Sequence, residues 1–109
     1  MEYNVARQFS RTPSARVFEE GKFPGAELRQ IIAPLIKECI DKKESFIINL
    51  DGASGYGTSF LEEVFGGLIR NEEINYQDLK SVLHFITKEE PELEAEIWEY
   101  IDDANNDKR

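Results

Sequence analysis

The sequence predicts an α/β domain with a small mixed sheet of about four strands and helices packed against it. Strand-like and helix-like patterns alternate along the chain, and a glycine-rich segment joins one buried strand directly to a helix. The length of 109 residues and the hydrophobic content of 40% fit one globular domain. We therefore expect a single domain over residues 1–109, with a polar tail from about residue 105.

The first half of the chain contains two expected strands and the strongest helix pattern. Residues 3–9 alternate loosely and predict a first strand, and residues 16–18 predict a short second one. From about Pro24 to Ile40, apolar residues recur every three or four positions, which is typical of an amphipathic helix. Pro34 lies inside this pattern and is expected to kink the helix.

The second half repeats the alternation. Residues 46–50 are almost continuously apolar, which predicts a central strand covered on both faces. A helix is expected from Ser59 to about Arg70, followed by a strand over residues 81–86. Thr87 and Glu90 have capping-box spacing, so a last amphipathic helix is expected to begin there.

Composition restricts the partners of this domain. Its formal net charge of -9 repels nucleic-acid phosphates and anionic lipid headgroups, so we expect neither nucleic acid nor a membrane as partner. The single cysteine, Cys39, excludes an internal disulfide framework and fits a reducing compartment. The sequence shows neither a secretory signal nor an apolar run of membrane-spanning length. We expect a cytoplasmic protein, and the sequence leaves self-association open.

The segment after the central strand carries most of the chemical signals. A strand, a glycine loop and a helix start with two hydroxyls are together suited to binding or carrying phosphate. The backbone amides of such a loop can also form a nest for an anion. The segment reads Asp51-Gly52-Ala53-Ser54-Gly55-Tyr56-Gly57-Thr58-Ser59.

This segment lacks a required residue of each known catalytic motif that it partly matches. Gly52 and Gly57 have phosphate-loop spacing, but Thr58 stands where a lysine is required. A dinucleotide fingerprint from Gly55 would need glycine where Phe60 stands, and a nucleophile elbow is one residue short. We therefore expect no enzyme and no cofactor. No metal site is expected either, because the chain has one histidine and no ligand cluster at metal spacing.

The helix after the loop has two features with alternative interpretations. Ser59 and Glu62 have capping-box spacing, so the Ser59 hydroxyl can cap the helix. Thr58 or Ser59 can also accept a phosphoryl group near the positive end of the helix, and the two roles are compatible. Gly66 and Gly67 indicate close packing of the helix on the sheet, early helix termination, or a flat surface for a partner's backbone.

The residues 48–52 and 55–70 together resemble the signature of the STAS-like family of unknown function. Their sequences are INLDG and GYGTSFLEEVFGGLIR. That family is named for its similarity to the sulphate-transporter and anti-sigma-factor-antagonist domain, and the resemblance implies a STAS-like fold. In anti-sigma-factor antagonists, an ATP-dependent kinase phosphorylates a serine or threonine at the strand–loop–helix junction and so switches partner binding off. By position, Ser59, with Thr58 beside it, corresponds to that residue.

Two functional hypotheses follow. The first is a non-enzymatic regulatory module that docks a protein partner, such as a histidine-kinase-like ATPase, through the loop and helix of residues 51–70. The second is a small-ligand or nucleotide-binding domain that uses the loop of residues 52–59 as an anion nest. The loop candidates are Asp51, Gly52, Ser54, Gly55, Tyr56 and Gly57, and the partner-binding candidates are Glu62, Glu63, Gly66, Gly67 and Arg70.

Overall fold

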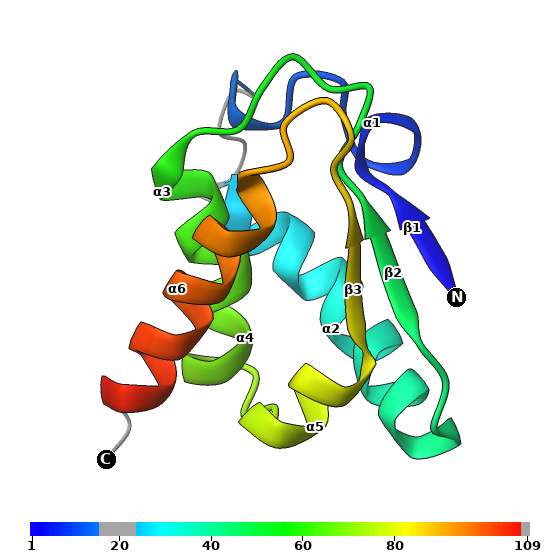
Figure 1. Cartoon of the computed structure of the whole chain (residues 1–109), viewed down its shortest axis with the longest axis vertical. Coiled ribbons are helices and arrows are strands. Elements are labelled where there is room, and N and C mark those ends of the chain that lie inside the picture. The colour runs from blue at the N-terminus through cyan, green and yellow to red at the C-terminus, as the bar shows by residue number, and fades with distance from the viewer. Residues whose placement is uncertain (16–23, 108–109) are drawn as a thin grey trace.

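The computed structural model describes residues 1–15 and 24–107. Its sheet has three strands, β1 (Glu2–Asn4), β2 (Phe46–Asn49) and β3 (Leu83–Ile86), in the order β1-β2-β3 (Figure 1). Both pairs are parallel, so the described sheet is parallel throughout and the expected mixed sheet is wrong for these residues. The fourth expected strand, at residues 16–18, lies outside the described residues.

The first strand is much shorter than predicted. It ends at Asn4, and a helical turn, α1 (Val5–Gln8), takes up most of the remaining residues. The Asn4 side chain caps this turn by accepting a hydrogen bond from the Arg7 N–H at 2.9 Å. The cap gives the backbone an alternative to the strand, which the loose alternation of residues 3–9 did not reveal.

The long helix α2 (Pro24–Lys42) confirms the strongest sequence pattern. It continues through Pro34, whose side chain is exposed. The helix is followed by Lys43 at φ 57°, with hydrogen bonds from the Lys43 N–H to the Ile40 carbonyl and from the Glu44 N–H to the Cys39 carbonyl. This left-handed ending turns the chain directly into β2.

The segment after the loop forms one continuous helical run in three parts. These are α3 (Thr58–Leu61), a π-helical turn η2 (Glu62–Gly66) and α4 (Gly67–Arg70). The predicted helix over residues 59–70 is therefore confirmed, with its start one residue earlier. The sequence analysis did not predict the π-helical turn.

The C-terminal third differs from the prediction in two places. A helix, α5 (Tyr76–Val82), with Asn75 as its N-cap, occupies the start of the expected strand, so β3 begins only at Leu83. The last helix, α6 (Leu93–Asp107), starts six residues after Thr87, so the predicted Thr87–Glu90 capping box is wrong. The polar residues 105–107 are the last turn of this helix.

The core lies between the sheet and the helices. On β2, Phe46 and Ile48 are buried whereas Ile47 and Asn49 are only half-buried, so the sheet presents one face to the core. Phe85 of β3 extends the core by edge contacts with Phe65, at 5.7 Å between ring centroids, and with Trp98 of α6, at 6.2 Å. Within the described ranges, no helix combines the length and apolar character that crossing a membrane requires.

Candidate functional site

The glycine loop connects the carboxyl end of β2 to the helix of residues 58–70, at the upper end of the sheet in Figure 1. In open α/β sheets, ligands and partners bind at the carboxyl ends of the strands. The loop lies beside the segment that leads from β3 to α6 and beside the N-terminal segment that precedes α2. Hydrogen bonds from the loop to these two segments determine which of its backbone groups are available to a ligand.

Asp51 and Gly52 hold the loop against the segment that follows β3. The two carboxylate oxygens of Asp51 accept hydrogen bonds from the backbone N–H groups of Lys88, at 3.2 Å, and Glu89, at 3.0 Å. In return, the Gly52 N–H donates to Oε1 of Glu89 at 2.8 Å. The Asp51 N–H is itself bonded to Oδ1 of Asn49 at 3.0 Å. Asp51 is therefore a structural clamp between two loops.

Ser54 and Gly57 hold the other side of the loop. The Ser54 N–H donates to the Arg11 carbonyl at 2.8 Å, and the Gly57 N–H donates to Oγ of Ser14 at 2.8 Å. The sequence analysis missed Ser14, which lies 43 positions from its partner. The only feature of the nearby sequence that draws attention to Ser14 is its place in the Thr12-Pro13-Ser14 turn.

These bonds weaken the hypothesis of an anion nest. An anion nest needs backbone N–H groups that converge on an open position. In this loop the N–H groups of Asp51, Gly52, Ser54 and Gly57 already have acceptors within the chain. The Gly52 contact also brings the Glu89 carboxylate to the loop, beside the carboxylate of Asp51, where both repel an anion.

Tyr56 anchors the centre of the loop. Its hydroxyl donates to the Leu50 carbonyl at 2.7 Å, and its ring packs 6.0 Å from that of Phe60. Burial, together with the nearby Asp51, Glu90 and Glu89 carboxylates, raises the pKa of Tyr56 far above its ordinary value. Tyr56 is therefore a neutral hydrogen-bond donor at every physiological pH.

Thr58 and Ser59 occupy different environments. The helix begins at Thr58 with Gly57 at the N-cap, so the predicted cap by Ser59 is wrong. Burial and a hydrogen bond to Glu96 raise the pKa of Tyr100, and a hydrogen bond with Thr58 opposes them, which places the Thr58 side chain against α6. Thr58 and Ser59 are both exposed, at the first and second positions of the helix. The two candidates therefore differ in the bond between Thr58 and Tyr100, not in exposure.

Gly66 and Gly67 are buried beneath charged side chains. A Cβ at Gly66 would lie 2.6 Å from Oε2 of Glu62 and 2.8 Å from Nη1 of Arg70, because these two residues form an ion pair across it. A Cβ at Gly67 would lie 2.5 Å from Nη1 of Arg29. The glycines therefore serve close packing, but against charged side chains and α2 rather than against the sheet.

Arg29 is the buried charge that the sequence analysis missed. Its side chain is only 7% exposed, and Nη1 donates to both Oε1 and the backbone carbonyl of Glu63, at 2.7 and 2.8 Å. Its Nε donates to Oε2 of Glu72 at 3.1 Å. One turn earlier, a Cβ at Gly25 would lie 2.8 Å from Cβ of Glu63, so α2 approaches the helix very closely here. Glu63 thus contacts α2, and its side chain remains 35% exposed.

Other reactive groups of the described chain are remote from the loop. Cys39 is buried in the core, and burial raises the pKa of its thiol, which makes it unreactive. His84 is an exposed residue of β3. Across residues 1–15 and 24–107, no three histidine, cysteine, aspartate or glutamate side chains gather as a metal site.

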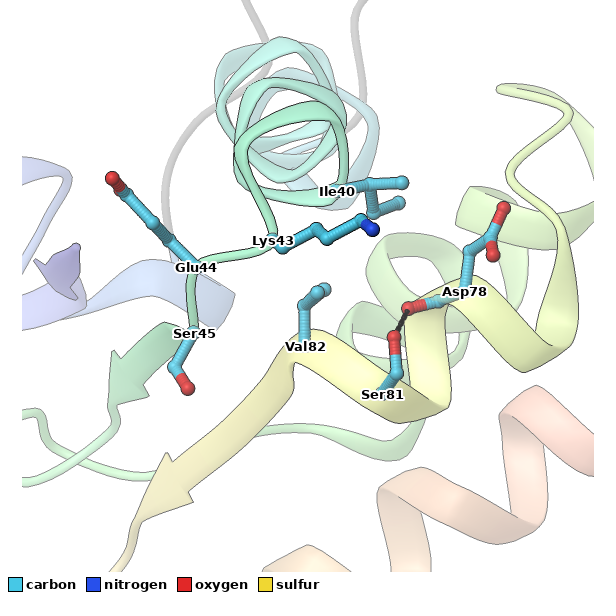
Figure 2. A pocket seen from close by; sticks show the side chains of 7 residues that line it. All are labelled: Ile40, Lys43, Glu44, Ser45, Asp78, Ser81 and Val82. Carbon is cyan, nitrogen blue, oxygen red and sulfur yellow. Dashed lines mark hydrogen bonds between the residues drawn. The ribbon is translucent and has the colours of Figure 1, made fainter.

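A pocket of about 360 Å³ lies at the opposite end of the sheet, where α2 leads into β2 and α5 leads into β3 (Figure 2). Its polar groups include Lys43 and Asp78, and the Ser81 hydroxyl donates to the Asp78 carbonyl at 2.7 Å. None of the candidate residues lines it. It lies at the amino ends of the strands, away from the usual position of functional sites in this class of sheet.

These features define a small α/β domain whose candidate site is the loop and helix that follow its central strand. The chain belongs to the family of STAS-like domains of unknown function, whose model matches residues 24–92. The resemblance noted from the sequence is confirmed. The match includes the loop and the helix of residues 58–70, and it ends before α6. No curated protein and no solved structure matched this chain.

Proposed function

We propose that this domain is a non-enzymatic regulatory module that docks a protein partner through the loop and helix of residues 51–70 and is switched by phosphorylation of Ser59. The partner class is a histidine-kinase-like ATPase, as for the anti-sigma-factor antagonists that the chain resembles. The observation that carries the proposal is the exposed Ser59 hydroxyl on the first turn of the helix, beside a loop whose polar groups are bonded within the chain.

Ser59 is the better acceptor of the two hydroxyls. A kinase needs a free hydroxyl as nucleophile, and the exposed Thr58 hydroxyl is engaged by Tyr100 on α6. A phosphate on Thr58 would also approach the Glu96 carboxylate, which accepts a hydrogen bond from Tyr100 at 2.8 Å. Phosphorylation of Thr58 would therefore disturb the packing of α6, whereas phosphorylation of Ser59 changes only the surface.

The added charge acts on docking rather than on folding. A phosphate at the second position of a helix interacts favourably with the positive end of the helix dipole. The carboxylates of Glu62 and Glu63 on the next turn are paired with Arg70 and Arg29, so the phosphate adds new negative charge to this surface. A partner that fits the unmodified helix start would then meet new negative charge and a bulkier side chain.

The test uses the full chain and the kinase-like ATPase encoded nearest to its gene. Wild type, Ser59→Ala and Thr58→Val are incubated with this kinase and magnesium ATP, and modified sites are mapped by mass spectrometry. We expect phosphate on Ser59 in wild type and Thr58→Val, none in Ser59→Ala, and at least tenfold weaker binding of Ser59→Asp to the kinase. The absence of both a complex and modification of Ser59 would contradict the proposal.

A further inference from the structure

Buried residues in the helix of residues 58–70 would extend around an unusually wide arc of an ordinary α-helix. The sequence of residues 59–70 divides into three groups of four, Ser59–Glu62, Glu63–Gly66 and Gly67–Arg70, each with two apolar or buried middle residues. An α-helix turns about 100° per residue, so a repeat of four drifts by about 40° each time and by about 80° over two repeats. In a regular helix, the first and last of these buried residues, Phe60 and Ile69, would point in opposite directions, about 180° apart.

The π-helical turn η2 removes this drift. A π-type turn closes with i→i+5 hydrogen bonds and so holds one more residue than an α-turn. One extra residue subtracts about 100° from the drift, which leaves the two ends about 20° apart. The buried pairs 60–61 and 68–69 can then both reach the core, and Glu62 and Arg70 can pair across Gly66, with Arg70 Nη2 to Glu62 Oε1 at 3.1 Å.

Arg29 is placed to hold this turn open. In a regular α-helix, the Glu63 carbonyl would accept its hydrogen bond from the Gly67 N–H. Here Nη1 of Arg29 donates to that carbonyl at 2.8 Å and lies over Gly67, where a Cβ would be only 2.5 Å away. A side chain that inserts at a helix carbonyl is a recognised cause of such irregular turns. Glu72 and the Glu63 carboxylate fix the guanidinium in this position.

We propose that Arg29 is a positioning residue that sets the register of the docking helix. By bonding the Glu63 carbonyl it keeps the wide turn open, and so it fixes the rotation of Thr58 and Ser59 relative to Arg70. Its importance for docking rests on the proposed function, whereas the register itself is a property of the domain alone. Arg29 never needs to touch the partner in order to determine the surface that the partner meets.

Hydrogen exchange of the full chain without partner tests the role of Arg29. In Arg29→Met we expect the amides of residues 63–67 to exchange at least tenfold faster relative to those of β2. The matched control is Glu72→Gln, which removes one charge but leaves the bond between Arg29 and the Glu63 carbonyl. It should leave the exchange of the turn within about twofold of wild type. Unchanged exchange in Arg29→Met, or equal acceleration in both variants, would overturn the proposal.

Deleting Gly66 tests the wide turn itself. Removal of one residue should close the turn into a regular α-helix and keep both ends in phase, so the variant should melt in a single cooperative transition. Deleting Glu99, an exposed residue in the middle of α6, should instead rotate Ile101 and Ala104 out of the core and abolish that transition. In the Gly66 deletion, adding Arg29→Met should no longer accelerate exchange of the helix. Loss of folding on deletion of Gly66, or an undiminished effect of Arg29→Met in that background, would contradict the inference.

These outcomes are separable from the docking test. The exchange and melting experiments need no partner, so they remain interpretable if the kinase neither binds nor modifies the domain. Conversely, a negative exchange result removes the role of Arg29 and leaves the modification of Ser59 to be decided by mass spectrometry.

Discussion

The loop of residues 50–57 and the helix of residues 58–70 are neighbours in the sequence and both are rich in glycine, but they use it differently. In the loop, Gly52 and Gly55 adopt φ values of 91° and 122°, which residues with a side chain rarely adopt. These glycines therefore allow the tight turn between β2 and α3. In the helix, Gly66 and Gly67 have ordinary φ values and provide room for the charged groups of Glu62, Arg70 and Arg29.

The difference shows where recognition can occur. The loop bonds its backbone groups to neighbouring segments of the chain, at Ser14, Arg11 and Glu89. The helix carries the exposed Ser59 hydroxyl at its start and the partly exposed Glu62–Arg70 pair along its length, whereas Arg29 of α2 is buried against it. The partner that we propose would therefore meet more side-chain groups on the helix than in the loop. The predictions below test this contrast.

Arg29→Met should have the largest effect on stability. It leaves the Glu63 and Glu72 carboxylates and the Glu63 carbonyl without their donor, at a cost of about 3 kcal/mol in the free energy of unfolding. Urea denaturation followed by circular dichroism measures this loss. Lys42→Met, which removes a lysine from an exposed i,i+4 pair, is the control and should change stability by less than about 0.5 kcal/mol. Equal effects of the two variants would show that the buried network is no more important than a surface pair.

Asp51→Ala should be the most damaging change in the loop. It removes the acceptor for the Lys88 and Glu89 N–H groups, which costs about 2 kcal/mol. Asp51→Asn keeps one carboxamide oxygen as an acceptor and should cost about half as much. Thermal and urea denaturation give both values. Wild-type stability in Asp51→Ala would mean that the clamp does not support the loop.

Gly67→Ala and Gly66→Ala form a matched pair on the helix. Both gain about 1 kcal/mol of helix propensity. At Gly67 the new Cβ displaces the buried Arg29 guanidinium, so we expect a net loss of about 1 kcal/mol. At Gly66 it meets only the ends of the half-exposed Glu62 and Arg70 side chains, so stability should be nearly unchanged. The reverse order would show that the exposed pair, not Arg29, requires the glycines.

Tyr56→Phe should weaken the domain in a pH-dependent manner. At neutral pH the loss of the bond to the Leu50 carbonyl costs about 1 kcal/mol. Because folding raises the pKa of Tyr56, its contribution is fully present below the unfolded pKa of about 10 and declines as the pH rises above it, by about 1.4 kcal/mol per pH unit. The advantage of wild type over Tyr56→Phe should therefore shrink between pH 9 and pH 11 in urea denaturation. The same difference in stability between wild type and Tyr56→Phe at every pH would show that the Tyr56 hydroxyl is not buried.

The Glu62–Arg70 pair should give the smallest effect. Its side chains are 39% and 34% exposed, so a double-mutant cycle with Glu62→Gln and Arg70→Met should give a coupling of about 0.5 kcal/mol. This coupling should fall in 0.5 M sodium chloride, because salt screens exposed charges. A coupling above about 2 kcal/mol that resists salt would remove the distinction between this pair and the Arg29 network.

The sequence predicted most of the elements but not their limits. The helix at residues 24–42 follows from a clear periodicity and the strand at residues 46–49 from an almost continuous apolar run, and the structure confirms both elements. The expectation that this strand is covered on both faces is wrong, because Ile47 and Asn49 are only half-buried.

The first strand is shorter than predicted, because Asn4 caps the helical turn that follows it. The cap at Ser59 and the capping box at Thr87 were wrong: Gly57 is the N-cap of α3, and Asp51 accepts from the N–H groups that follow Thr87. Local spacing alone does not rank such competing caps.

The sequence by itself determined the long helix, the central strand, the glycine loop and the paired hydroxyls of Thr58 and Ser59, because these depend on local periodicity and local residue types. Only the tertiary structure decided that the N–H groups of Gly52 and Gly57 are bonded within the chain, that Thr58 contacts Tyr100 on α6, and that Arg29 lies over Gly67. Arg29 lies 34 positions from Glu63 and 43 from Glu72. No short-range pattern connects residues at such distances. Packing of α2 against the helix brings these charges together, and burial makes their pairing essential.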